Sequence, residues 1–252
     1  MKNLYAYRVV WVVLVAGLLS GVVFRESIRR TFSRRRTVAD TITELKLKRG
    51  AEFQKSYPDL AYVKRVLLVA VKNTRRLEVW TQNDEGDLFQ YRKTYAFTGF
   101  SGKAGPKRLS GDRQIPEGVY ALTGLNPNSR HRLSVKVGYP NAVDEEFARK
   151  ERRTNLGGDI FIHGSNTSIG CIPIGDPNAE ELFFLLAHVK PGGAHIVIMP
   201  VDFRLKRFRN YTGAKAYERR IYRLVREEIR TKLPAINLST AFFAKGEKKT
   251  AF

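Results

Sequence analysis

The chain has 252 residues and a formal net charge of +21, with 43% hydrophobic and 27% charged side chains. This length allows one sizeable domain with its own core plus appendages, and this apolar content excludes a disordered chain. The single cysteine excludes an intramolecular disulfide, so packing must stabilise the fold.

The positive charge is concentrated at the two ends of the chain. Residues 1–50 carry 11 Lys/Arg and 3 acidic residues, residues 203–252 carry 14 and 4, and residues 51–202 carry 20 and 17. Basic ends favour a polyanion such as lipid headgroups, an anionic envelope surface or nucleic acid; a solvated surface without a partner is the other interpretation. We expect no nucleic-acid partner, because the chain has no basic stripe interleaved with aromatic residues and no recognised binding motif.

The N-terminal segment is apolar. Residues 9–24 contain no charge, and this length lies between a membrane span of roughly 20 residues and a signal-peptide core of roughly 7–15. The bulky, charged sequence Phe24-Arg25-Glu26 is no small-residue cleavage site. We therefore predict an uncleaved transmembrane anchor over residues 1–24 in preference to a cleaved signal.

The orientation of this anchor is ambiguous. Its downstream flank is rich in arginine, whereas only Lys2 and Arg8 precede or interrupt it, so the positive-inside rule keeps the downstream chain in the cytoplasm. The cysteine site described below instead favours a domain outside the cytoplasm. We give this site more weight than the charge bias, because the charge bias is only statistical. Apolar residues at helical spacing predict a juxtamembrane linker or helix within the basic residues 25–59.

Apolar patterning predicts a β-rich domain over residues 60–203. Strands are expected at 65–71, 76–80, 88–97, within 111–123, at 133–137, 159–163 and 194–200, and helices at 144–150 and 178–189. Asp176-Pro177 is a typical helix start, with Asp176 as the cap and Pro177 in the first turn. The glycine-rich residues 99–111 predict a surface loop without the Gly-Lys-Ser/Thr ending of a phosphate-cradling loop.

The C-terminal extension, residues 204–252, contains a basic amphipathic helix. Apolar side chains recur close to helical spacing at Ala214, Tyr217, Ile221, Val225 and Ile229, and the arginines lie mostly off this stripe. Two placements are open. The helix either packs on the domain with its arginines in solvent or lies on an anionic surface.

The clearest chemistry lies within residues 159–175. A short apolar strand ends at His163-Gly164, and a polar turn leads to Ser168-Ile169-Gly170-Cys171. A thiol and an imidazole are a nucleophile and a base, and a tight turn brings them within hydrogen-bond reach. Gly170 allows two successive backbone N–H groups to face a carbonyl oxygen that becomes an anion during attack. We predict that Cys171 and His163 form a catalytic pair.

These residue types also have simpler roles in proteins. A lone cysteine is commonly a small core residue. Zinc needs three or four ligands, and Cys171 with His163 supplies two, so we expect no metal and no other cofactor. His131, His188 and His195 fall at expected strand or helix positions, and we interpret them as structural or solvent-facing.

The order of a β-rich domain, His-Gly, Ser-x-Gly-Cys and a capped helix resembles the L,D-transpeptidase catalytic domain, the YkuD-type family. The resembling motifs are Gly111-Asp112 with residues 116–120, then residues 161–164, then residues 168–172. The short gap between histidine and cysteine is most similar to the YafK-type branch of murein L,D-transpeptidases and endopeptidases. The resemblance implies a mainly β fold with α, namely a β-sandwich-like domain with a helix after the cysteine.

The resemblance also implies roles for the site residues. Cys171 matches the nucleophile and His163 its base. Gly170 and the backbone of Cys171 match the oxyanion donors. Ser168 and Gly164 match the residues that shape the turn. Two departures stand out: Ile169 replaces a histidine that many members carry, and only eight positions separate the histidine from the cysteine. Ile169 cannot donate a hydrogen bond, and the short gap removes a lid segment.

The family further implies a cysteine acyltransferase that forms a thioester at the L-centre of diaminopimelate in peptidoglycan stem peptides, in cell-wall remodelling. Its substrates would be such peptides or a wall-tethered protein, and its place the bacterial envelope, with the domain in the periplasm or exported. An amine acceptor gives transpeptidation, and water gives endopeptidase or carboxypeptidase action. A catalytically inactive wall-binding module is the alternative from another class.

Overall fold

The computed structural model describes residues 35–208 and 210–234. The anchor predicted over residues 1–24 lies outside these ranges. Among the described residues, no helix combines the length and apolar character needed to cross a membrane. The compact unit that carries the site begins at Val38.

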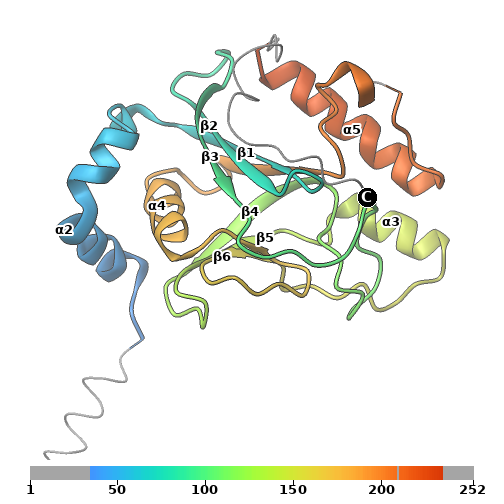
Figure 1. The fold of residues 1–252 in the computed structure, drawn as a ribbon, viewed down its shortest axis with the longest axis horizontal. Helices are drawn as coiled ribbons and strands as arrows, with labels where there is room; N and C mark the ends of the chain where they lie inside the picture. Colours follow the sequence, from blue (N-terminus) through green and yellow to red (C-terminus); the bar gives the residue numbers. More distant parts are fainter. Residues whose placement is uncertain (1–34, 209, 235–252) are drawn as a thin grey trace, which may run out of the picture. The chain divides into compact units, whose positions relative to one another are not determined.

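Eight strands form one mixed sheet in the order β3-β2-β1-β8-β4-β5-β6-β7 (Figure 1). The strands are β1 (Arg65–Val71), β2 (Arg76–Gln82), β3 (Gln90–Ala96), β4 (Gly118–Asn126), β5 (Ser134–Val137), β6 (Phe161–His163), β7 (Ile172–Pro173) and β8 (Ala194–Met199). Neighbours are antiparallel except for the parallel pairs β1–β8 and β6–β7. Seven strands match predicted ones, and β7 is the addition.

The sheet curls at β4. The first half of β4, residues 118–121, pairs with β8, and residues 122–126 pair with β5. The register shifts between Leu122 and Gly124, and an extra residue of this kind bends a strand and increases its twist. The fold is therefore mixed α/β with one curled sheet, where we expected a β-sandwich-like domain. The bend lets one sheet cover its own core.

The main core lies inside this curl. It includes Leu68 of β1, Val135 of β5 and Ile196 of β8, all with exposed fractions of 3% or less. Helix α4 (Asp176–Ala187) packs into it through Leu182 and Leu185. In β1 and β8 nearly every residue is buried, because helices or strands cover both faces of the sheet there. This double coverage explains why residues 66–71 of β1 and 196–199 of β8 are continuous apolar runs without alternation.

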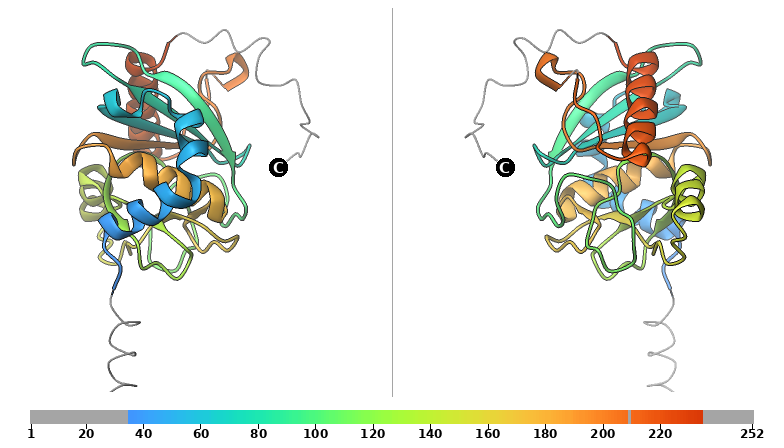
Figure 2. Two further views of the ribbon diagram at one scale, coloured as in Figure 1. Left: turned by 90° about the vertical axis from the view of Figure 1, so that its left-hand side faces the viewer. Right: turned by 90° about the vertical axis from the view of Figure 1, so that its right-hand side faces the viewer.

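Helix α5 (Ala216–Lys232) packs on the other face of the sheet, opposite α2 and α4 (Figure 2). Its buried residues include Tyr217, Ile221, Val225 and Ile229, which are four of the five residues of the predicted stripe. Of the two placements left open by the sequence, the structure shows the first, in which the stripe packs on the domain. Ala214 precedes the helix and is exposed.

Helix α2 (Val38–Ser56) packs on α4, which is therefore buried on nearly all sides. Phe53 of α2 is fully buried, and its ring centroid lies 4.6 Å from that of Phe184. The apolar run of residues 182–186 fits this position, because a helix with apolar residues all round must be covered all round. The remaining helices are α3 (Ala142–Lys150) and the short 3₁₀ turns η1 (Leu60–Tyr62) and η2 (Lys206–Phe208).

The packing of α2 on α4 predicts a contrast between two residues of α2. Phe53→Ala should lower the free energy of unfolding by about 3–5 kcal/mol, because it leaves a cavity in a closed cluster. Leu47 is 84% exposed, and Leu47→Ala should change that energy by less than about 0.5 kcal/mol. Urea unfolding of both variants measures the difference, and equal effects would contradict the packing.

Candidate active site

The pairing of β6 with β7 brings the predicted histidine and cysteine to one end of the sheet. In this parallel pair Ile162 lies opposite Ile172 and His163 lies opposite Pro173. Cys171 immediately precedes β7. On the other side of β6, Ser134 of β5 lies opposite His163. The strand register therefore places both residues at neighbouring positions.

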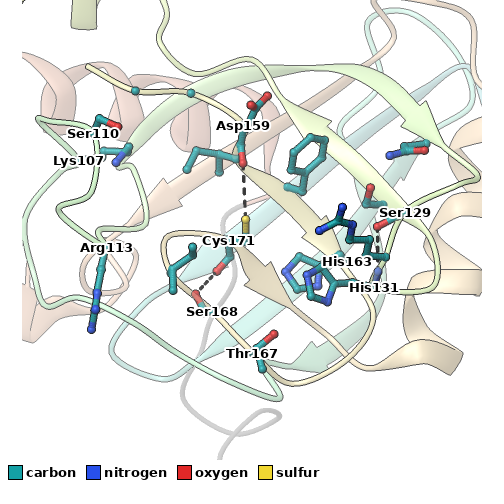
Figure 3. A pocket seen from close by; sticks show the side chains of 18 of the residues that line it. Lys107, Ser110, Arg113, Ser129, His131, Asp159, His163, Thr167, Ser168 and Cys171 are labelled. Carbon is teal, nitrogen blue, oxygen red and sulfur yellow. Dashed lines mark hydrogen bonds between the residues drawn. The ribbon is translucent and has the colours of Figure 1, made fainter. Parts of the chain in front are cut away.

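Cys171 and His163 line the same cavity, which has a volume of about 1040 Å³ (Figure 3). Its lining comes from residues 107–113, 126–134, 157–163 and 167–171. This volume lies at the upper limit of the roughly 300–1,000 Å³ that is typical of small-molecule sites. The thiol of Cys171 points toward Asp159, and the ring of His163 lies beside that of His131.

His163 is held in one tautomer by its own neighbour. Its side chain is buried, and its Nδ1 lies 2.5 Å from the Gly164 carbonyl oxygen. A carbonyl only accepts, so Nδ1 carries the proton and Nε2 keeps the lone pair that a base needs. Burial lowers the pKa of His163, and His131 lowers it further, against the opposing effects of the Gly164 carbonyl and Asp176. The imidazole therefore stays neutral and basic at neutral pH.

His131 belongs to the site, which the sequence interpretation missed. It lies on the turn between β4 and β5, and its ring centroid is 4.6 Å from that of His163. Its backbone carbonyl accepts a 3.1 Å hydrogen bond from the Gly164 N–H. A Cβ on Gly164 would lie 2.8 Å from this carbonyl oxygen, so only glycine fits there. The missing signal was the pairing of β5 with β6, which sequence patterning does not supply.

Cys171 does not direct its thiol at the imidazole. The partly exposed thiol donates to the Asp159 carbonyl oxygen, with 3.7 Å between the heavy atoms. Burial raises the pKa of Cys171, and the Asp159 carboxylate raises it further, against lowering by the Phe161 N–H and Lys107. The expected hydrogen bond between the thiol and the imidazole is therefore not formed in this arrangement, and the raised pKa keeps the thiol protonated.

The turn before the cysteine is tied together by Ser168. Its hydroxyl donates to the Cys171 carbonyl oxygen at 2.7 Å and lies 2.8 Å from the Ser101 hydroxyl. The Gly170 N–H, expected as an oxyanion donor, is directed at this same hydroxyl at 3.3 Å. Gly170 has φ +125°, which a side chain rarely adopts. Ile169 is 76% exposed at the cavity.

The prediction that Asp176 caps the following helix is wrong. Gly175 occupies the cap position with φ 77°, and Asp176 is the first residue of α4. The Asp176 carboxylate instead accepts a 2.7 Å hydrogen bond from the Ser165 N–H. Ser165 itself has φ 64°, so this bond stabilises a left-handed residue two positions after the histidine.

The raised pKa of Cys171 can be measured by alkylation. The rate of reaction with iodoacetamide should rise with pH to a midpoint above the ordinary thiol value of about 8.5, because the native site disfavours the thiolate. The chain has one cysteine, so the same chain unfolded in urea is a control that needs no substitution. A lower midpoint in the native chain than in the unfolded one would show a preformed thiolate and contradict the arrangement.

Comparison with known proteins identifies relatives. The family model for the YkuD L,D-transpeptidase catalytic domain matches residues 64–198. YafK of Escherichia coli strain K12 is 30% identical over 143 residues, which are 56% of this chain and 55% of YafK. The chain thus spans about half the length of that curated relative.

Two solved structures are also similar. The helical cell shape determining protein Pgp2 from Campylobacter jejuni has a TM-score of 0.44 and 19% identity, over 60% of this chain and 55% of Pgp2. Bd1075 of Bdellovibrio bacteriovorus has a TM-score of 0.39 and 21% identity, over 66% of this chain and 56% of its own. The family match, which covers more than half of the chain, is decisive: this chain belongs to the YkuD family of L,D-transpeptidase catalytic domains.

Proposed function

We propose that this protein is a cysteine-dependent acyl transferase acting on peptidoglycan stem peptides in cell-wall remodelling. The observation that supports this most is the joint presence of Cys171 and His163 in one cavity of an L,D-transpeptidase-family domain, with His163 at the end of β6 and Cys171 directly before the adjacent parallel strand β7. The proposed substrate bond is the amide at the L-centre of diaminopimelate. A peptide or a wall-tethered protein carries that amide.

The chemistry begins with a proton transfer. The Cys171 thiol leaves the Asp159 carbonyl, turns toward His163 and gives its proton to Nε2, whose lone pair is free because Nδ1 faces the Gly164 carbonyl. The sulfur then bonds to the amide carbon, and the carbonyl oxygen becomes an anion. The backbone N–H groups of Gly170 and Cys171 stabilise it, and the Gly170 N–H exchanges the Ser168 hydroxyl for it.

The intermediate collapses to a thioester. The C–N bond breaks, and the imidazolium of His163 returns its proton to the leaving amine. An amine acceptor, deprotonated by His163, attacks the thioester to give a new amide and free thiol. Water in that position gives hydrolysis, so endopeptidase or carboxypeptidase action is the first alternative. The second alternative is a wall-binding module in which none of these reaction steps takes place.

The charges of the cavity favour an anionic substrate. Lys107 pairs with Asp112 at 2.7 Å and Asp159 with Lys136 at 3.1 Å. Arg113 and Arg130 line the cavity and are exposed, and neither has an ion-pair or hydrogen-bond partner within the described part of the chain. Two free guanidinium groups suit the carboxylates of an acidic peptide.

We place the domain in the bacterial envelope, in the periplasm and held at the inner membrane by the segment of residues 1–24. The uncharged residues 9–24 support a membrane anchor. The basic ends of the chain suit an anionic envelope surface. The domain limits of 60–203 and 204–252 stay predictions within this proposal.

Removing the thiol tests the enzyme hypothesis. Cys171→Ala should lower turnover of tetrapeptide muropeptides on the order of 10⁶-fold, as loss of a nucleophile does. The unfolding midpoint should hardly change, because the hydrogen bond from the thiol to the Asp159 carbonyl oxygen is long. Mass analysis of the products detects turnover, and full activity in the variant would reject the proposal.

The same assay separates transfer from hydrolysis. Wild-type protein incubated with muropeptides and an added amine should yield a product heavier than either donor fragment. If only hydrolysis products form at every amine concentration, the peptidase alternative holds. If no product forms and Cys171 captures no acyl group from a thiol-reactive acylating probe at neutral pH, the binding module holds.

The two unpaired arginines predict a binding effect. Arg113→Gln and Arg130→Gln should each raise KM up to about fivefold with little change in kcat, as expected for exposed charge pairs. Arg223→Gln removes the same charge from an exposed position of α5 outside the cavity lining and should leave KM unchanged. A substrate whose carboxylates are converted to amides should abolish the difference between wild type and variants.

A further inference from the structure

Helix α5 lies outside the residues matched by the family and packs on the sheet face away from the main core. Two of its side chains are nevertheless connected to the segments that enclose the catalytic cavity. We call residues 105–114 the first wall, because Lys107, Ser110 and Arg113 line the cavity. We call residues 151–159 the second wall, which contributes its residues 157–159.

The first wall is fastened through a buried carboxylate. Tyr222 of α5 donates from its hydroxyl to Glu117 Oε2 at 2.8 Å. Glu117 is fully buried, and its Oε1 accepts from Lys72 Nζ at 2.8 Å and from the Gly105 N–H at 2.9 Å. Lys72 Nζ also donates to the carbonyls of Gly105 and Ile115 at 2.9 and 3.0 Å. This network therefore holds both ends of the first wall.

The second wall is fastened through helix α3. Tyr217 of α5 donates from its hydroxyl to Asp144 Oδ1. The other oxygen of Asp144 accepts from the Asn141 N–H at 2.9 Å, which closes the cap of α3. The second wall follows directly after α3. Tyr217 thus fixes the element from which this wall departs.

The ring of Tyr217 also touches the point where the two walls meet. The Arg108 guanidinium carbon lies 5.4 Å from the ring centroid and that of Arg153 lies 5.9 Å from it. Arg153 in turn donates to the Arg108 carbonyl oxygen at 2.7 Å. One buried tyrosine therefore contacts both walls and the helix that leads to the second.

Both walls touch the turn that carries the cysteine. The carbonyl oxygen of Gln114, at the end of the first wall, lies 3.1 Å from where a Cβ on Gly170 would stand. The carbonyl of Asp159, at the end of the second wall, accepts from the Cys171 thiol. A shift of either wall therefore reaches the nucleophile or the residue beside it.

We propose that α5 is a working part of the catalytic unit, in which Tyr217 and Tyr222 are positioning residues that hold the two walls against the Cys171 turn. Neither tyrosine touches the cavity. Each acts through a buried carboxylate: Glu117 accepts from the Gly105 N–H of the first wall, and Asp144 caps α3, which leads to the second wall. Only the kinetic readout of this inference rests on the proposed function.

Hydroxyl deletions in the full chain test the inference kinetically. Tyr217→Phe and Tyr222→Phe keep the ring and should lower kcat/KM roughly tenfold to 100-fold, because small displacements of reacting groups cost that much. Val225→Ala is the control: Val225 is fully buried in the same helix and belongs to the same apolar cluster, and its side chain has no hydroxyl to bond Asp144 or Glu117. It should lower the unfolding midpoint at least as far while kcat/KM stays within twofold of wild type. Activity loss that follows the unfolding midpoint across all three variants would overturn the inference.

Amide hydrogen exchange gives a readout that needs no activity. Tyr222→Phe should speed exchange in the first wall, and Tyr217→Phe should speed it in both walls, whereas Val225→Ala should affect α5 and spare them. Walls that exchange at the wild-type rate in both tyrosine variants would overturn the inference. If wild type shows no turnover of muropeptides, the proposed function fails, and the exchange pattern still decides whether α5 holds the walls.

Discussion

The short parallel pairing of β6 with β7 is the constraint on which the site depends. Parallel strands normally need a connection of about a dozen residues or more, and here only residues 164–171 join them. So short a connection forces left-handed backbone at Ser165 and Gly170. It also forces close packing, because a Cβ on Gly99 would lie 2.0 Å from the Asn166 carbonyl oxygen. This geometry alone accounts for the glycines and serines of the turn, independently of any catalytic role.

A turn of this kind presents the thiol without activating it. In the resting site Cys171 has a raised pKa and donates to a backbone carbonyl, while His163 has a lowered pKa and an unprotonated Nε2. Both groups are then neutral, so no ion pair must be broken when a neutral amide enters. Since the thiolate is also the species that oxidants attack, a protonated resting thiol is less exposed to oxidation. Activation on substrate entry therefore suits the envelope location that we propose for this domain.

Sequence patterning predicted the elements better than their contacts. The strands β1 and β8, the helix after the cysteine and the stripe of α5 were found because long apolar periodic segments carry a strong signal. β7 has two residues and no periodicity to detect. The stacking of His131 on His163 and the packing of α2 on α4 join residues far apart in the sequence, which local patterns do not encode. The cap at Gly175 was not predicted. Asp176 fits the sequence rule for a helix cap, but its carboxylate accepts from the Ser165 N–H instead.

The buried ion pair of Lys72 and Glu117 connects the sheet to helix α5. Two charges with exposed fractions of 1% and 0% lose their hydration, and such pairs contribute little net stability compared with apolar residues of the same size. The pair fixes the orientation of its neighbours, because each charged group tolerates few positions once its hydrogen-bond partners are fixed. Lys72 belongs to the loop after β1, Glu117 precedes β4 and Tyr222 lies on α5, so the network joins three elements around one stretch of backbone. An apolar cluster there would hold the elements together while allowing that backbone to slide, and a cavity that must place a thiol and an imidazole cannot tolerate such sliding.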